Sequence, residues 1–259
     1  MSELSSSAAK AVVWDDVSKV YPGGHQAVRG VSLSVARGEV LALLGTSGSG
    51  KTTLLKMVNA LIEPSSGRVV VRDRCTTEWD PIALRRSIGY VIQEGGLMPH
   101  LSVLDNVALA ARVQGSPLRE QHSLAASRLE LVGLDPARFG RLFPRQLSGG
   151  QRQRVGVARA LAASSDLILM DEPFGALDPI TRRELQDEFR RLQRRLKTTV
   201  VLVTHDLREA CRLGGRLALL HEGELVQVGP ASAFLQSPAD HYVREFFLDA
   251  AAVDLPSKD

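Results

Sequence analysis

Residues Gly45 to Thr52 have the spacing of a phosphate-binding loop, G-x-x-x-x-G-K-[ST]. Glycines allow positive φ and let backbone N–H groups approach phosphate oxygens that a Cβ atom would block. Lys51 is expected to reach the outer phosphates of a nucleotide, and the Thr52 hydroxyl is expected to bind Mg²⁺. The candidate nucleotide-binding residues of this segment are Gly45, Thr46, Ser47, Gly48, Ser49, Gly50, Lys51, Thr52 and Thr53.

Two adjacent acids follow an apolar run at residues 167 to 170. Asp171 is a candidate Mg²⁺ ligand, directly or through water. Glu172 is placed to orient or deprotonate an attacking water. Acids at strand ends are common and usually solvated, so this pair gains its meaning from the phosphate loop. Together the two segments predict nucleotide hydrolysis.

The elements around these segments predict an α/β fold. Residues 39 to 44 are continuously apolar after Glu39, which is typical of a strand buried on both faces, and the phosphate loop follows directly. Apolar residues then keep a helical period from Leu54 to Ile62. Further strands at 68–72, 88–93, 167–170 and 199–203 alternate with helical patterns, one of them between Ile180 and Lys197. Such alternation predicts a parallel sheet with helices on both faces.

Three other regions differ from this alternation. The N-terminal part predicts strands at 11–14, 17–21 and 28–35. The stretch from about Leu97 to Ala163 carries helical patterns, at 103–113, 121–132 and 151–162, and no buried-strand signal. We therefore expect a helical insertion within the α/β domain. The tail predicts a hairpin over 216–228, turning at Glu222-Gly223, and a final helix over 238–251.

Composition narrows the class of protein. The 259 residues carry a net charge of only +3, which does not by itself indicate a nucleic-acid or membrane-surface partner. The two cysteines fit a reducing cytosol. No apolar run reaches the roughly 18 residues that span a bilayer, and the N-terminus lacks the layout of a signal peptide. We expect a cytosolic protein that another chain would carry to any membrane.

The segment Leu147-Ser148-Gly149-Gly150-Gln151 resembles the signature sequence of ABC-type ATPases. Besides the phosphate loop, six landmarks of that family occur in the family's order, over roughly residues 11 to 230. Beside the signature and the phosphate loop, the matches are Tyr21 to the aromatic residue that stacks on adenine, Gln93 to the Q-loop glutamine, Asp171-Glu172 to the Walker B acids, Ala176-Leu177-Asp178 to the D-loop, and His205 to the switch histidine.

The resemblance implies ATP and Mg²⁺ as cofactors and gives each matched residue a role. The alternatives from the residues alone are a half-buried aromatic at a strand end for Tyr21, an exposed amide for Gln93 and a solvated side chain for His205. The implied catalytic residues are Glu172, His205, Lys51 and Gln93. The implied metal ligands are Thr52, Gln93 and Asp171. Beyond the phosphate loop, the nucleotide would contact Tyr21, Ser148, Gly149, Gly150, Gln151 and Asp178.

The family's fold is a P-loop NTPase (RecA-like) parallel-sheet core with an N-terminal antiparallel β region and an inserted helical subdomain. On that basis we expect an ABC ATPase domain over 11–235, the helical subdomain over about 97–163, and a helical tail over 236–259. The resemblance also implies a head-to-tail dimer of this chain, or of this chain with a related ATPase subunit. Ser148 and Gly150 of one subunit would then contact the γ-phosphate held by the other.

Two classes of function fit an ABC ATPase: the motor of a membrane transporter, or a soluble protein acting on DNA or ribosomes. DNA-repair relatives carry a long coiled coil between the positions of Gln93 and Ser148, where this chain has room only for a compact subdomain. A phosphoryl-transferring kinase is a third option, which the signature segment disfavours. Arg152, Arg154 and Arg159 are interpreted as a solvated helix face and not as a nucleic-acid site, because no aromatic residues are interleaved with them.

Several segments resemble the ATPases of quaternary-amine and osmoprotectant importers, for example 88–93, 96–100, 174–182 and 239–246. That resemblance implies permease subunits in the membrane, a solute-binding protein, and a place on the cytoplasmic face of the membrane. Many of those ATPases continue into tandem regulatory CBS domains, and in this respect we expect this chain to depart from them, with no CBS domains. An amino acid, a polyamine or a sulfonate remains an alternative cargo, because the ATPase does not touch the solute.

Overall fold

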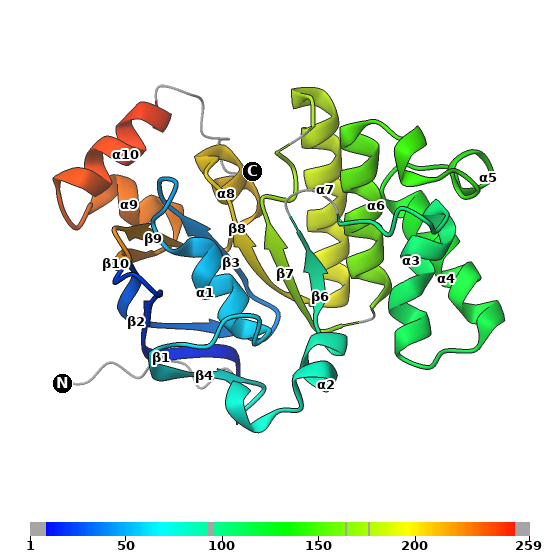
Figure 1. Ribbon diagram of the computed structural model, residues 1–259. Coiled ribbons are helices and arrows are strands. Elements are labelled where there is room, and N and C mark those ends of the chain that lie inside the picture. The colour runs from blue at the N-terminus through cyan, green and yellow to red at the C-terminus, as the bar shows by residue number, and fades with distance from the viewer. Residues whose placement is uncertain (1–8, 93–95, 164, 176, 252–259) are drawn as a thin grey trace.

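Two β-sheets with helices around them make up the computed structural model, which describes residues 9–92, 96–163, 165–175 and 177–251 (Figure 1). The larger sheet has the strand order β10-β9-β3-β8-β7-β6. All neighbouring strands in it are parallel except β10, which is antiparallel to β9. Its strands are β3 (Val40–Leu44), β6 (Gly89–Val91), β7 (Leu167–Asp171), β8 (Thr199–Val203), β9 (Arg216–His221) and β10 (Glu224–Gly229).

The central strands of this sheet explain the apolar runs in the sequence. Every residue of β3, β7 and β8 is buried, because helices cover both faces of the sheet. The expected hairpin is confirmed, with β9 and β10 joined at Glu222-Gly223. Both residues of that turn have positive φ, as a two-residue hairpin turn of type I′ requires.

The smaller sheet is antiparallel and has the order β2-β1-β4-β5. The two strands expected at 11–14 and 17–21 form one strand, because its pairing continues with β2 through a register shift between Trp14 and Val17. Trp14 is buried against α1 (Lys51–Val58), and its indole N–H donates to the Leu54 carbonyl at 3.1 Å. The strands are β1 (Lys10–Val20), β2 (Gln26–Ala36), β4 (Ser66–Val71) and β5 (Arg74–Cys75).

Helix α1 is shorter than its apolar period predicted. It ends at Val58, and Ala60 adopts a left-handed conformation at φ 51°. The Leu61 and Ile62 N–H groups then both bond back to the Lys56 carbonyl, which closes the helix end. The expectation of a helix through Ile62 was therefore wrong by one turn.

A cluster of helices occupies residues 103 to 162, at the green side of Figure 1. The described residues from 96 to 163 contain no strand, as the sequence predicted. Buried Asn106 fixes the entry to this cluster, since its side-chain amide donates to the Met98, Leu101 and Ser102 carbonyls. The helices are α3 (Val103–Val113), α4 (Leu118–Leu131), α5 (Pro136–Phe139) and α6 (Gly149–Ala162), with a 3-10 helix over Pro144–Gln146.

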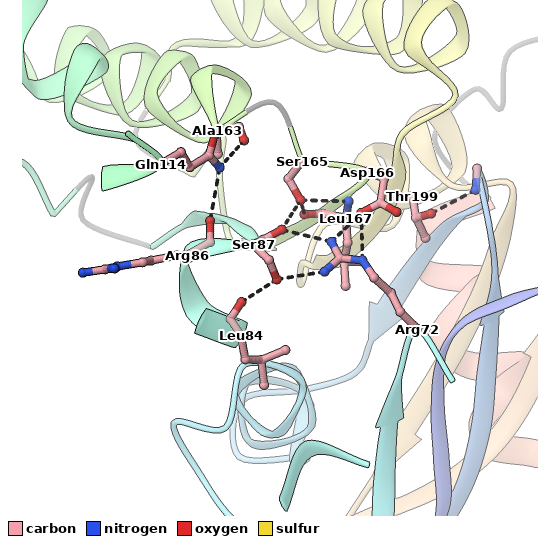
Figure 2. Close-up of polar contacts among 11 residues, drawn as sticks. Arg72, Leu84, Arg86, Ser87, Gln114, Ala163, Ser165, Asp166, Leu167 and Thr199 are labelled. Atoms are coloured by element: carbon pink, nitrogen blue, oxygen red, sulfur yellow. Dashed lines mark hydrogen bonds and ion pairs between the residues drawn. The ribbon is translucent and has the colours of Figure 1, made fainter. Parts of the chain in front are cut away.

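A polar network at the amino end of β7 connects the two sheets to the helices (Figure 2). Arg72, which follows β4, pairs with Asp166 and donates to the Ser87 hydroxyl at 2.8 Å. The Ser165 hydroxyl donates to the Ser87 carbonyl at 2.6 Å, and Gln114 bonds the Ala163 carbonyl at the end of α6. Ser87 ends α2 (Pro81–Arg86), which the sequence reading missed, as it missed the 3-10 helix Thr76–Glu78.

The remaining helices are α7 (Pro179–Leu196), α8 (Leu207–Leu213), α9 (Ala231–Gln236) and α10 (His241–Ala251). Helix α7 agrees with the predicted apolar stripe at Leu185, Phe189 and Leu192, which are buried, whereas Leu196 at the helix end is exposed. The single tail helix expected over 238–251 begins only at His241, and α9 precedes it. Within the described residues, no helix is both long and apolar enough to cross a membrane.

Candidate nucleotide-binding site

Three neighbouring strands lead to the phosphate loop, the acidic pair and His205 at one edge of the larger sheet. β8 lies between β3 and β7, and its Val203 pairs with Leu43 on one side and Asp171 on the other. The three strands are parallel, so their carboxyl ends meet. The phosphate loop, the acidic pair and the turn with His205 therefore lie next to one another.

The phosphate loop needs glycine at two places where it passes another strand or turn. At Gly45, with φ 142°, a Cβ atom would lie 2.2 Å from the Leu220 carbonyl oxygen. At Gly50, with φ 97°, it would lie 2.4 Å from the Ala27 carbonyl oxygen. Both distances are far inside van der Waals contact, so the backbone path is available only to glycine. The N–H groups of the loop and of the first turn of α1 can then serve an anion.

Lys51 lies inside this loop with only 6% of its surface exposed. Its ammonium donates to the Gly45 carbonyl at 2.9 Å, the Thr46 carbonyl at 2.7 Å and the Ser49 hydroxyl at 3.2 Å. Burial lowers the pKa of Lys51, and the charges of Glu172 and Asp171 oppose that shift. A polyanion in the loop would stabilise the charged ammonium further.

Thr52 and Asp171 form an oxygen pair beside the loop. The Thr52 hydroxyl donates to Asp171 Oδ1 at 3.0 Å. Burial raises the pKa of Asp171, and the hydrogen bond from Thr52 opposes the rise. Hard oxygen ligands of this kind suit Mg²⁺, which takes few protein ligands and completes its shell with phosphate and water. Among the described residues, no group of three or more His, Cys, Asp or Glu side chains is placed to hold a metal ion.

Glu172 is held by its backbone at the end of β7. Its φ is 47°, its N–H donates to the Val203 carbonyl at 3.0 Å, and its carbonyl accepts from Gln153 Nε2 at 3.0 Å. A left-handed backbone at a residue other than glycine is strained and recurs at functional sites. The carboxylate Oε1 lies 3.3 Å from Nδ1 of His205, whose side chain is 65% exposed.

Tyr21 follows β1 and is half-buried beside α1. Its hydroxyl lies 3.4 Å from the Thr53 hydroxyl. Its ring is nearly parallel to that of His25, with 6.5 Å between centroids, and Lys19 Nζ lies 5.5 Å from its centroid. Tyr21 is thus adjacent to the helix that carries the phosphate loop. Its adenine-stacking role stays a prediction.

The signature residues lie in a second place, at the amino end of α6. Ser148 caps the helix by accepting from the Gln151 N–H at 3.2 Å, and Gln151 Oε1 accepts from the Ser148 N–H at 2.9 Å. Gly149 and Gly150 occupy the first turn. A cleft of about 600 Å³ is lined by these four residues together with Asp178, which caps α7, and it is not lined by Lys51. A hydrogen bond from the Thr181 N–H lowers the pKa of Asp178.

Two further sets of predicted residues lie away from this edge of the sheet or outside the described part of the chain. Gln93 and Ala176 lie outside the described residues. Arg152, Arg154 and Arg159 do not form a solvated face, so that expectation was wrong. Each is half-buried and donates to a backbone carbonyl, of Leu147, Val132 and Gly96 respectively. Helix α6 is covered by its neighbours, which turns these side chains inward.

The sequence reading missed several polar residues behind His205. Arg182 contacts Asp206, and Thr204 contacts buried Glu209. The only signal in the sequence is that Thr204 and Asp206 flank His205 and that Arg182 follows Asp178 by four residues. That spacing places Arg182 one helical turn from Asp178, but nothing local indicates its contact with Asp206.

Comparison with known proteins agrees with this geometry. A family model described as ABC transporter matches residues 28–175. The glycine betaine/carnitine/choline transport ATP-binding protein OpuCA of Bacillus subtilis is 51% identical over 90% of this chain and 61% of its own length. The choline transport ATP-binding protein OpuBA of the same organism is 48% identical over 95% of this chain and 64% of its own length. The chain therefore spans about six tenths of these two relatives.

A shorter relative and a solved structure are matched over more of their own length. The glycine betaine uptake system ATP-binding protein YehX of Escherichia coli is 45% identical over 91% of this chain and 76% of its own length. A dimeric ATP-binding cassette, solved in a post-hydrolysis state with ADP and Pi, has a TM-score of 0.79 at 35% identity. It covers 85% of this chain and 98% of that one. With a family model over more than half of its length and relatives over nine tenths of it, the chain belongs to the ABC transporter family, as an ATP-binding cassette.

Proposed function

We propose that this chain is the ATP-hydrolysing motor subunit of an ABC importer. The observation that carries the proposal is the meeting of Lys51, the Thr52–Asp171 pair and the Glu172–His205 pair at one sheet edge. Such a site combines phosphate binding, a place for a metal, and a base beside the phosphate. These are the parts that phosphoryl transfer to water needs.

In the proposed reaction, loop N–H groups and Lys51 hold the β- and γ-phosphates of ATP. Thr52, Asp171 and Gln93 would hold Mg²⁺, which supplies charge neutralisation at the phosphates. Glu172 orients the attacking water and takes its proton, and two hydrogen bonds hold its backbone at the end of β7. His205, at 3.3 Å from Glu172, donates to the γ-phosphate and keeps Glu172 aligned.

The signature cleft supports a head-to-tail dimer. The first N–H groups of α6 have no acceptor within the helix and favour an anion. They line a cleft that Asp178 also lines and that Lys51 of the same chain does not. A phosphate held by Lys51 of a second subunit would supply the anion that these N–H groups favour. A symmetric pair then makes two composite sites. Two solved relatives are described as dimeric, which supports a dimer of this chain.

A groove beside α2 and α3 supports a permease partner. It encloses about 420 Å³ and is mostly apolar, with Ile82 54% exposed on its rim and Met98 and Val113 also exposed. Arg85 and Arg159 add positive charge. The proposed occupant is a short helix of the membrane permease, which would place this chain at the cytoplasmic face of the membrane. Closure of the ATPase dimer would move the groove and that helix with it.

The proposed cargo is a quaternary amine such as glycine betaine, carnitine or choline, supplied by a solute-binding protein. The names of the relatives OpuCA, OpuBA and YehX support this cargo. The runner-up is an importer of another small solute, and a soluble ABC ATPase without transport is a more distant alternative. The test is uptake of the three labelled amines by cells that lack the chain. Restoration by the wild type and not by a Glu172→Gln variant supports the cargo, and uptake independent of the chain contradicts it.

Hydrolysis is tested with Glu172→Gln in the purified chain. Removing the proposed base should lower the rate of ATP hydrolysis about 100-fold or more. ATP binding should persist, so that the variant accumulates as an ATP-bound dimer in size-exclusion chromatography. Glu120→Gln, an exposed change on α4, is the control and should hydrolyse ATP at the wild-type rate. Normal hydrolysis by Glu172→Gln would remove Glu172 from the mechanism.

A further inference from the structure

We propose that Arg182 is a positioning residue for ATP hydrolysis, which holds the turn carrying His205 against the segment that leads into Asp178. The inference rests on the proposed function and adds to it a route between the partner-facing cleft and the chain's own catalytic edge. Arg182 touches neither the phosphate loop nor the acidic pair in the contacts described above. It would act through His205.

The Arg182 guanidinium bonds two segments at once. It lies in the first turn of α7, and its Nη2 donates to the Leu177 carbonyl at 3.0 Å and lies 3.5 Å from the Gly175 carbonyl. Its Nη1 lies 3.3 Å from Asp206 Oδ2. Both side chains of this ion pair are 29% exposed, so the pair is partly shielded from solvent. A planar guanidinium can serve a carbonyl and a carboxylate together, which the single ammonium of lysine cannot do as well.

Asp206 connects Arg182 to the turn that carries His205. Its Oδ1 caps α8 by accepting from the Arg208 N–H at 2.9 Å and the Glu209 N–H at 3.1 Å. Its own N–H donates to the Thr204 hydroxyl at 3.0 Å, and that hydroxyl donates to buried Glu209 at 2.6 Å. Residues on both sides of His205 are therefore fixed by side-chain bonds.

His205 itself depends on this turn for its position. Its side chain is largely exposed and its ring is 3.3 Å from Glu172. With little packing around the ring, the backbone of residues 204–206 determines where the imidazole lies. Loss of the Arg182–Asp206 pair should let the turn move and misplace His205 relative to Glu172. A small displacement of a catalytic group is enough to slow a reaction strongly.

The other end of the contact reaches the proposed dimer interface. Leu177, whose carbonyl accepts from Arg182, is followed by Asp178 and lines the same cleft as Ser148 and Gly150. In the head-to-tail dimer that cleft receives the partner's nucleotide. Arg182 thus joins a segment that the partner's ATP would contact to the turn that serves the chain's own ATP. Binding of the partner subunit would thus position His205 through the Arg182 side chain.

The test compares Arg182→Met with Arg183→Met, its exposed neighbour on α7, in ATP hydrolysis by the purified chain. We expect Arg182→Met to lower kcat about 10-fold or more, with KM for ATP and the melting temperature near those of the wild type. Arg182→Lys should recover part of the rate. Asp206→Asn, which keeps a capping oxygen and weakens the ion pair, should lower kcat in the same way. Arg183→Met should match the wild type.

A His205→Ala background separates positioning from a general structural effect. If Arg182 acts through His205, then adding Arg182→Met to His205→Ala should cause no further loss of kcat. An equal further loss in that background overturns the inference, and so does wild-type kcat in both Arg182→Met and Asp206→Asn. A wild-type chain that fails to hydrolyse ATP would instead defeat the proposed function. If the wild type hydrolyses ATP and both Arg182→Met and Asp206→Asn keep its kcat, the positioning role alone is overturned.

Discussion

Glu209 has a buried carboxyl group on α8, the helix that follows His205. The residue is 5% exposed, and among the described contacts its carboxyl group accepts one hydrogen bond, from the Thr204 hydroxyl at 2.6 Å. Burial raises the pKa of Glu209 to about 7 from an ordinary value of 4.5, and the charges of Asp206 and Glu172 add to the rise. The side chain therefore takes up a proton on folding at mildly acidic pH, and its charged form is disfavoured in the folded protein.

Glu209→Gln should stabilise the protein in a pH-dependent way. Because the pKa is higher in the folded than in the unfolded chain, wild-type stability falls as pH rises from about 4.5 to about 7 and levels off above that. The gain from glutamine should thus be absent below pH 4.5 and reach roughly 3 kcal/mol at most above pH 7. Urea unfolding at pH 4.5, 6 and 8 measures it. A gain independent of pH contradicts the raised pKa, and Glu120→Gln is the exposed control.

Gly50 and Gly23 allow a matched test of the phosphate loop. Both have φ 97°, but a Cβ atom at Gly50 would lie 2.4 Å from the Ala27 carbonyl oxygen, whereas at Gly23 nothing lies within 4 Å. Gly23→Ala should cost about 1 kcal/mol for the left-handed backbone alone. Gly50→Ala should cost clearly more and abolish ATP binding, because the loop must move. Thermal unfolding and ATP titration check both, and equal costs would contradict the steric argument.

At the scale of elements, helix ends combine stability with function. Ser148 caps α6 and Ser102 caps α3 with the same hydrogen bond, to the third N–H of the helix, at 3.2 and 3.1 Å. A capping serine contributes about 1 kcal/mol. Only the α6 cap lines the cleft with Asp178. The two helix ends should therefore behave alike in unfolding and differently in hydrolysis.

Ser148→Ala and Ser102→Ala should each lower the free energy of unfolding by about 1 kcal/mol. Ser148→Ala should in addition lower ATP hydrolysis several-fold, and Ser148→Arg should abolish it by blocking the cleft. Ser102→Ala should keep the wild-type rate. Urea unfolding and a hydrolysis assay on the same preparations separate the two effects. Equal rates in the two alanine variants would remove Ser148 from the nucleotide site.

At the scale of the whole molecule, the composite-site proposal makes a prediction about mixed dimers. Lys51→Ala disables the phosphate loop of a subunit, and Ser148→Arg disables its signature. When the two single variants are mixed, each heterodimer keeps one complete site, formed by the intact loop of one subunit and the intact signature of the other. ATP hydrolysis by the mixture should exceed that of either variant alone.

The double variant mixed with the wild-type chain is the matched control. Each heterodimer in that mixture pairs an intact half with a damaged half in both sites, so the heterodimers should add nothing to the activity of the remaining wild-type dimers. Recovery in the control and not in the mixture of single variants would mean that each site lies within one subunit. That outcome would contradict the head-to-tail arrangement.

Local pattern alone determined a large part of this protein. The phosphate loop is set by glycines that a bound anion and nearby carbonyls require, and the predictions of β3, β7 and β8 hold because a strand buried on both faces must be apolar throughout. Helix α3 was predicted at its observed bounds, and Ser102 signals its start. A predicted helix end was wrong where the backbone turned before the run of periodic apolar residues was over, as at Ala60.

Only the tertiary structure decided which of these segments meet. Thr52 and Asp171 are 119 residues apart in sequence. They are hydrogen-bonded because the strand order places β7 close to β3, with only β8 between them, and no local pattern encodes that order. The inward turn of the arginines on α6 and the reach of Arg182 to Asp206 depend likewise on packing between elements. The periodicity of apolar residues predicts which face of a helix or strand is buried. Which residues a side chain on that face contacts depends on the element that the folded core packs against it.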